Sequence, residues 1–90
     1  MIAGDVFHVG EFIKDEIDHI EMKQQQLADK MGISKSEVSL VIHGKRNITP
    51  ELAIKLEKAL DIDAVYWMRL QVRYEIEKIR IKNRGSSIDL

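Results

Sequence analysis

Three polar side chains recur on one face of a short predicted helix, where they could hydrogen-bond an extended polar partner. They are Lys35, Ser36 and Ser39. The opposite face of this helix carries apolar residues at helical spacing, namely Val38, Val41 and Ile42. Lysine can donate to the acceptors of guanine, and serine donates or accepts with little discrimination. A short helix with one polar face, held over a packed partner, fits the DNA major groove, so these side chains are predicted to read base edges.

A second set of side chains flanks this helix and suits phosphates rather than bases. The set consists of Gln24, Ser34, Lys45 and Arg46. Amide and hydroxyl groups hydrogen-bond phosphate oxygens, and the two cations neutralise phosphate charge. Lys45 and Arg46 also suit an ordinary charged loop, and Lys35 and Ser36 a solvated helix face, so the pattern alone leaves these alternatives open. Leu40 is also ambiguous, because it can contact a thymine methyl or pack within the protein.

The helices that position these side chains are predicted from apolar spacing and from signals at their ends. The first helix of the pair has one apolar face, made by Leu27, Ala28 and Met31. Gly32 supplies a turn residue that tolerates positive φ. Ser34, with Glu37 three residues later, predicts a capping box that starts the second helix. The stretch 24–46 is therefore predicted to form a helix, a tight turn, a second helix and a basic loop.

Three further helices are predicted, and no segment shows the strict alternation of a β-strand. One runs from about Val9 to His19, with an apolar stripe of Val9, Phe12, Ile13, Ile17 and Ile20. The next begins at Thr49-Pro50-Glu51 and buries Leu52, Leu56, Ala59 and Leu60. Asp63 is predicted to cap the last, which continues to about Lys82. The sequence thus predicts an all-α fold of five helices in one domain over residues 1–90, with a core at about 8–82 and a flexible tail at 83–90.

The last predicted helix is too apolar for a single contact surface. One of its stripes consists of Trp67, Leu70 and Tyr74, and it can close the core of the domain. The other consists of Val65, Met68, Val72, Ile76 and Ile79. A small monomer should not leave such a strip in water, so a two-fold homodimer is predicted to cover the second stripe.

Composition sets the expected location of the chain and separates its charges. The chain has no cysteine, which excludes disulfides and suits a reducing cytosol. No run approaches the ~18 apolar residues of a membrane span, and residues 1–5 lack the layout of a secretory signal, so a cytoplasmic protein without membrane contact is expected. The net charge of −1 gives no global attraction to nucleic acid. Residues 1–22 are nevertheless acidic, and residues 69–84 are basic. Both segments can be ordinary solvated helix faces; alternatively, the acidic segment binds a basic protein and the basic segment binds phosphates.

The chemistry of enzymes and of metal sites finds little support. His8, His19 and His43 have no metal-ligand spacing, and no cysteine could complete a site. No Gly-x-Ser-x-Gly elbow and no glycine-rich phosphate loop occurs. Asp15 and Glu16 are adjacent acids, which on so polar a helix suit solvent better than acid–base work. Neither an enzyme, a cofactor, a metal nor a small-molecule substrate is predicted.

Several segments together resemble a known family over about residues 8–82. Residues 24–39, QQQLADKMGISKSEVS, resemble the helix-turn-helix of lambda-repressor-like (Xre) proteins. Residues 43–56, HGKRNITPELAIKL, resemble a stretch of HigA-type antitoxins, and residues 67–75, WMRLQVRYE, resemble the signature that closes their domain. Residues 8–13, HVGEFI, are similar to the family's opening. The chain departs from the pattern at Val9, Lys23 and His43, where the family has proline, a capping serine or threonine, and asparagine, respectively.

The resemblance implies the antitoxin of a bacterial type II toxin–antitoxin system. Such a protein neutralises a RelE-like, mRNA-cleaving toxin and, as a dimer, binds palindromic operator DNA to repress its own operon. By resemblance, His43 joins the phosphate-binding set. Such toxins are usually basic, so the acidic residues Asp15, Asp18 and Glu21 are candidates for the toxin contact. Two alternatives stay open: a free-standing phage-type repressor without a toxin, and a protein-interaction module that has lost DNA binding.

Overall fold

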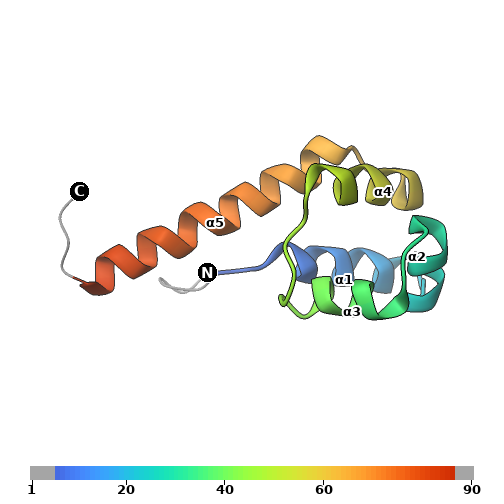
Figure 1. Cartoon of the computed structure of the whole chain (residues 1–90), viewed down its shortest axis with the longest axis horizontal. Helices are drawn as coiled ribbons and strands as arrows, with labels where there is room; N and C mark the ends of the chain where they lie inside the picture. Colours follow the sequence, from blue (N-terminus) through green and yellow to red (C-terminus); the bar gives the residue numbers. More distant parts are fainter. Residues whose placement is uncertain (1–5, 87–90) are drawn as a thin grey trace.

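The fold is a cluster of four short helices from which a fifth, longer helix projects (Figure 1). The computed structural model describes residues 6–86, with side chains for residues 6–83. Its helices are α1 (Val9–His19), α2 (Gln24–Met31), α3 (Lys35–Ile42), α4 (Pro50–Leu60) and α5 (Ala64–Ser86). Within the described residues there is no strand, which confirms the all-α prediction.

The last helix extends further than the sequence predicts. α5 continues to Ser86, four residues beyond the predicted end at Lys82, so residues 83–86 are helical rather than tail. The rest of the predicted flexible tail, at 87–90, and the predicted absence of a secretory signal at 1–5 fall outside the described residues. No helix in the described part of the chain is both long enough and apolar enough to cross a membrane.

Side chains that satisfy free backbone N–H groups fix the helix starts. Oγ1 of Thr49 accepts from the N–H of Leu52 at 3.2 Å, at the start of α4. Oδ1 of Asp63 accepts from the N–H of Val65 at 2.7 Å, which confirms Asp63 as the cap of α5. At the start of α2, where Lys23 offers no capping oxygen, Oε1 of Gln26 accepts from the N–H of Lys23 at 2.7 Å.

The core lies where α1 to α4 meet, and Trp67 of α5 closes it. Its fully buried members include Ile13, Ile17, Leu27, Leu56 and Trp67. Phe12 and Ile20 belong to the predicted stripe of α1, but they are 37% and 44% exposed and lie at its edge. α1 approaches α3 very closely, because a Cβ built on Gly10 would stand only 2.0 Å from the carbonyl oxygen of Val41. The α1–α3 contact therefore requires glycine at this position.

Candidate nucleic-acid interface

α3 is held by its apolar face on the helices beside it. Val38, Val41 and Ile42 are buried, and so are Leu27, Ala28 and Met31 on α2. Gly32 adopts a left-handed conformation with φ of 72°, and its N–H donates to the carbonyl of Asp29 at 3.3 Å. The predicted helix-turn-helix is therefore present, and its packing presents the polar face of α3 outward.

That polar face borders a surface groove that several predicted DNA contacts share. The groove is lined by residues of α1, α2 and α3, which include Lys14, Asp18, Lys23, Gln24, Lys35, Ser39 and His43. Helical spacing places Lys35, Ser39 and His43 in one row, each four residues after the last. The structure thus brings two predicted base readers, Lys35 and Ser39, beside two predicted phosphate contacts, Gln24 and His43.

Two cations of the groove, Lys14 and Lys23, are not among the residues that the sequence predicts for DNA. Lys14 is a single lysine in the acidic segment 1–22, and Lys23 occupies the cap position of α2. Their positions in the sequence therefore indicated no DNA contact for either residue. Only the packing of α1 and α2 against α3 places both beside Lys35. Lys23 adds positive charge beside Gln24, where the sequence predicts a phosphate contact, whereas the charge of Lys14 is offset by its ion pair with Asp18 in the same groove.

Leu40 and Ser36 lie on the exposed part of α3, outside this groove. Leu40 is 45% exposed and is not among the buried residues of the core. Its apolar side chain stays available for a thymine methyl. Ser36 is also exposed, on the turn after the cap.

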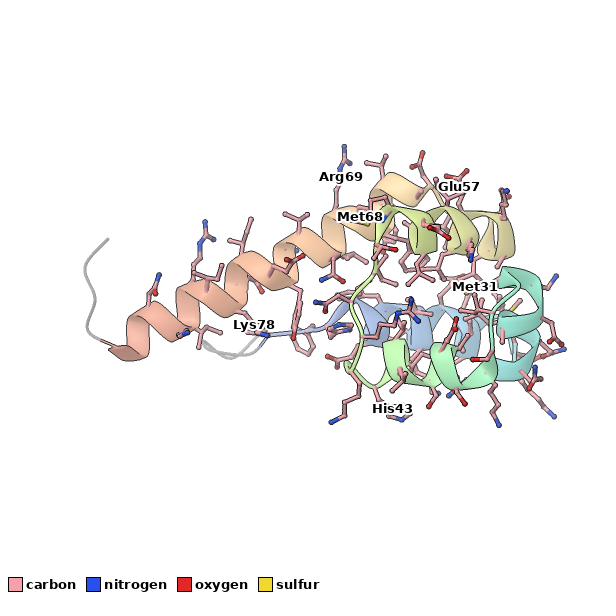
Figure 2. All side chains as sticks on the ribbon, viewed as in Figure 1. Met31, His43, Glu57, Met68, Arg69 and Lys78 are labelled. Carbon is pink, nitrogen blue, oxygen red and sulfur yellow. The ribbon has the colours of Figure 1, made fainter. Side chains whose placement is uncertain are left out.

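His43 follows the last turn of α3 and points away from the core (Figure 2). Its Nδ1 lies 2.8 Å from the carbonyl oxygen of Ser39. A carbonyl oxygen only accepts, so Nδ1 carries a hydrogen and donates to it. The same carbonyl also accepts from the backbone N–H of His43 at 3.0 Å, so the two bonds together fix the ring beside Ser39.

The basic loop after α3 begins with a left-handed glycine. Gly44 has φ of 73°, and the N–H of Lys45 donates to the carbonyl of Leu40 at 2.8 Å. This closes the end of α3 and sends Lys45 and Arg46 into solvent, where both are exposed.

The capping box predicted for α3 is only half present. Oγ of Ser34 accepts from the N–H of Glu37 at 3.1 Å, as predicted for the cap. The Glu37 carboxylate does not return this bond; its Oε2 lies 3.8 Å from Nη1 of Arg46. The cation explains the difference, because an arginine within reach attracts the carboxylate away from the helix end. Arg46 therefore faces an acid in the absence of DNA, and both side chains stay exposed, where such a pair contributes only about 0–1 kcal/mol.

The residues predicted for the toxin contact do not share one environment. Asp15 and Glu21 are exposed. Asp18 forms an ion pair with Lys14 at 2.6 Å and lines the groove beside α3. A partner that engages Asp18 would therefore reach the same groove as the predicted DNA contacts.

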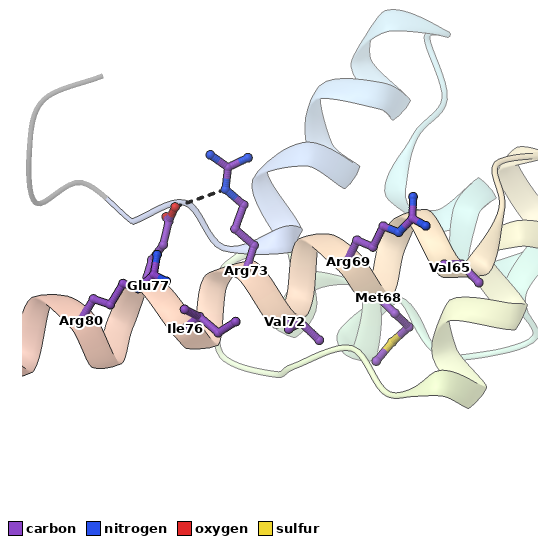
Figure 3. A pocket seen from close by; sticks show the side chains of 8 residues that line it. All are labelled: Val65, Met68, Arg69, Val72, Arg73, Ile76, Glu77 and Arg80. Carbon is purple, nitrogen blue, oxygen red and sulfur yellow. Dashed lines mark hydrogen bonds and ion pairs between the residues drawn. The ribbon is translucent and has the colours of Figure 1, made fainter. Parts of the chain in front are cut away.

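The predicted dimer surface is an exposed apolar groove along α5 (Figure 3). Four of its five predicted residues line the groove, namely Val65, Met68, Val72 and Ile76. Ile79 lies outside the lining and is 58% exposed. Arginine side chains and one acid border the groove, and Nε of Arg73 lies 3.2 Å from Oε1 of Glu77. Val65, Val72, Ile76 and Ile79 are exposed, whereas Met68 is partly buried against the core.

Comparison with known proteins agrees with this geometry. The helix-turn-helix family model matches residues 13–67. Virulence-associated protein A' of Dichelobacter nodosus is 30% identical to this chain over an alignment of 91 positions, and the alignment covers 91% of this chain and 79% of that protein. A HigA-family addiction module antidote protein from Coxiella burnetii has a TM-score of 0.83 at 28% identity, over 89% of this chain and 88% of that one. Antitoxin HigA of Pseudomonas aeruginosa, solved with the higBA promoter, has a TM-score of 0.82 at 26% identity, over 91% and 90% of the two chains. The chain therefore belongs to the Xre-type helix-turn-helix family, and it shares its fold with HigA-family antitoxins.

Proposed function

We propose that this chain binds operator DNA, with α3 in the major groove, and thereby represses its own operon. The observation that carries this proposal is the groove in which Lys35, Ser39 and Gln24 lie side by side. Base-reading and backbone-binding groups have to be adjacent on one surface to engage one DNA groove and its phosphates. The HigA structure solved with its promoter supports the same use of this fold.

The proposed contacts divide into reading and positioning. Base edges are read by Lys35, Ser36, Ser39 and Leu40. Phosphates are held by Gln24, Ser34, His43, Lys45 and Arg46. Because serine discriminates weakly, Lys35 supplies most of the sequence preference, through guanine acceptors.

Lys35→Ala is expected to reduce the ratio of specific to non-specific affinity about tenfold, because one good base contact is worth about 1–3 kcal/mol. Titration of the chain's own promoter and of an unrelated duplex at the same salt concentration measures this ratio. Lys30→Ala is the matched control, since it removes an exposed lysine of α2 that does not line the groove. Equal effects of the two substitutions would contradict base reading by Lys35.

Lys45→Ala is expected to weaken binding to every duplex and to lower the slope of log K against log salt by about 0.9, the value for one phosphate contact. Arg46→Ala should lower the affinity for DNA more than Lys45→Ala does, because it also leaves the Glu37 carboxylate without its ion pair near the DNA. The double variant R46A/E37Q should then recover part of that affinity. A salt titration of the three variants tests the assignment, and an unchanged slope for Lys45→Ala would refute it.

The proposed second activity is neutralisation of an mRNA-cleaving, RelE-like toxin. The structural likeness to HigA-family antitoxins supports it, and the exposed acids Asp15 and Glu21 of the α1 region offer a surface for a basic partner. Co-expression with the product of the adjacent reading frame tests this role. A harmless neighbour, or a pair that fails to co-purify, would leave a free-standing repressor as the function.

We also propose that the chain works as a homodimer joined through α5. Its support is the apolar groove in which Val65, Val72 and Ile76 are exposed beside the partly buried Met68, on a helix that extends past the core. The neighbouring Ile79 would extend the same contact. A two-fold pair presents two α3 helices, and their half-sites on palindromic DNA are expected about 34–36 Å apart.

A further inference from the structure

Two polar side chains are buried behind the basic loop, away from the candidate DNA surface. They are Gln71, which is 1% exposed, and His8, which is 6% exposed, and they are the buried polar residues of the described chain. A buried polar group has to find hydrogen-bond partners, or its desolvation destabilises the fold. The partners of these two therefore show what the pair holds in place.

Gln71 of α5 binds the main chain of the loop. Its Oε1 accepts from the N–H of Ile48 at 2.8 Å, across 23 residues of sequence. Because a backbone N–H only donates, this bond fixes the orientation of the amide, and Nε2 donates to Oε2 of Glu75 at 3.2 Å. Ile48 itself is 4% exposed and anchors its side chain in the core.

His8 holds the adjacent residue of the loop. Its Nδ1 accepts from the N–H of Gly10 at 2.9 Å, so the hydrogen of the neutral ring is on Nε2. Nε2 then donates to Oδ1 of Asn47 at 3.1 Å, across 39 residues. The imidazole also meets the ring of Tyr74 edge to face, with centroids 4.6 Å apart. Asn47 and Ile48 are thus tied to α1 and to α5, directly after Lys45 and Arg46.

We infer that Gln71, with His8 behind it, positions the basic loop for phosphate binding. The inference rests on the proposed DNA-binding function. Without these bonds, only the buried Ile48 side chain and the bond from Lys45 to Leu40 would restrain the segment between α3 and α4, and DNA would have to order the rest of it on binding. With them, Lys45 and Arg46 leave the fold from a fixed backbone. Gln71 is therefore a positioning residue, which acts on DNA through the loop and not by contact.

Gln71→Met tests the inference, because methionine has a similar size but cannot accept a hydrogen bond from Ile48. We expect the slope of log K against log salt to fall by about 0.9, which corresponds to a roughly fivefold weaker Kd at 0.15 M salt. The probe is a duplex of the chain's own promoter. Amide hydrogen exchange at Ile48 should become faster at the same time.

The charge-neutral exchange Q71E/E75Q provides the rescue. A carboxylate at position 71 can accept from Ile48, and an amide at position 75 can donate to it, so both bonds keep a donor and an acceptor with the net charge unchanged. Because the carboxylate then stands at a position that is 1% exposed, the melting temperature of this variant is measured together with its slope. We expect this double variant to recover the wild-type slope and slow exchange at Ile48. Slow exchange at Ile48 with the slope still lowered would overturn the inference, because the loop would then be held in place while the phosphate contact stayed lost.

Two comparisons separate positioning from a loss of stability. Leu60→Ala trims a partly buried core contact at the end of α4, at the opposite end of that helix from the loop, and should lower the melting temperature while the slope stays unchanged. Asn47→Ala removes the hydrogen-bond partner of His8, and it should lower the slope as Gln71→Met does. Because Asn47 is exposed, this variant keeps the test available if Gln71→Met fails to fold. A wild-type slope in both loop variants would overturn the positioning role alone. Failure of the wild-type chain to bind any duplex would instead overturn the proposed function.

Discussion

Gly10→Ala is expected to lower the melting temperature of the protein by about 10–20 °C, which is a larger loss than the one expected for Gly32→Ala. The new methyl group would stand 2.0 Å from the carbonyl oxygen of Val41 and 2.8 Å from that of Ile42. Both are backbone atoms of α3, so neither can turn aside as a flexible side chain does. α1 would have to move away from α3, at a cost of about 3 kcal/mol, which the better helix propensity of alanine offsets only in part.

Gly32→Ala is the control, because it tests backbone conformation without crowding. Gly32 has φ of +72°, and a Cβ there would meet no atom within 4 Å. Its replacement should cost about 1–2 kcal/mol, and Gly32→Asn less, since asparagine tolerates the left-handed region. Thermal unfolding followed by circular dichroism compares the variants. If Gly10→Ala melted at or above the temperature of Gly32→Ala, the close approach of α1 and α3 would be wrong.

The helices were predictable because their signals are local. Val9–His19 matches the predicted helix, and the Thr49-Pro50 start of α4 is confirmed by the bond from Leu52 to Thr49. Each such signal lies within four residues of sequence, which is the range over which helix caps act. The buried face of α3 also follows from local spacing, and with it the outward direction of Lys35 and Ser39.

The parts that sequence reasoning missed depend on residues distant in the chain. The Gln71–Ile48 and His8–Asn47 bonds span 23 and 39 residues, and no periodicity reports such pairs. A glutamine inside the apolar stripe that begins at Trp67 was the available signal for a buried amide. The Glu37 carboxylate shows the converse failure, because a local rule assigned it to the cap while Arg46, nine residues later, attracts it instead.

Ile76→Asp is expected to convert the proposed dimer to a monomer and to raise the Kd for the promoter by about 10³-fold, the low end of the gap between specific and non-specific binding. In the single chain, Ile76 is 43% exposed, so an aspartate there leaves the fold intact. In a paired α5, each aspartate would be buried against the apolar side chains of the stripe, and the arginines that border the groove would offset its desolvation only in part, which leaves a cost of several kcal/mol. The charge therefore acts on association rather than on folding.

Ile54→Asp separates dimer loss from the added charge. Ile54 of α4 is 50% exposed and outside the apolar groove, so its variant adds the same negative charge while the stripe stays intact. Sedimentation should show a monomer for Ile76→Asp and a dimer for Ile54→Asp. The slope of log K against log salt is a second criterion. A monomer binds one half-site and should show about half the wild-type slope, whereas an added charge alone removes no phosphate contact and should leave the slope unchanged. A wild-type chain that sediments as a monomer at high micromolar concentration would contradict the dimer, and the stripe on α5 would then have to serve a different protein partner.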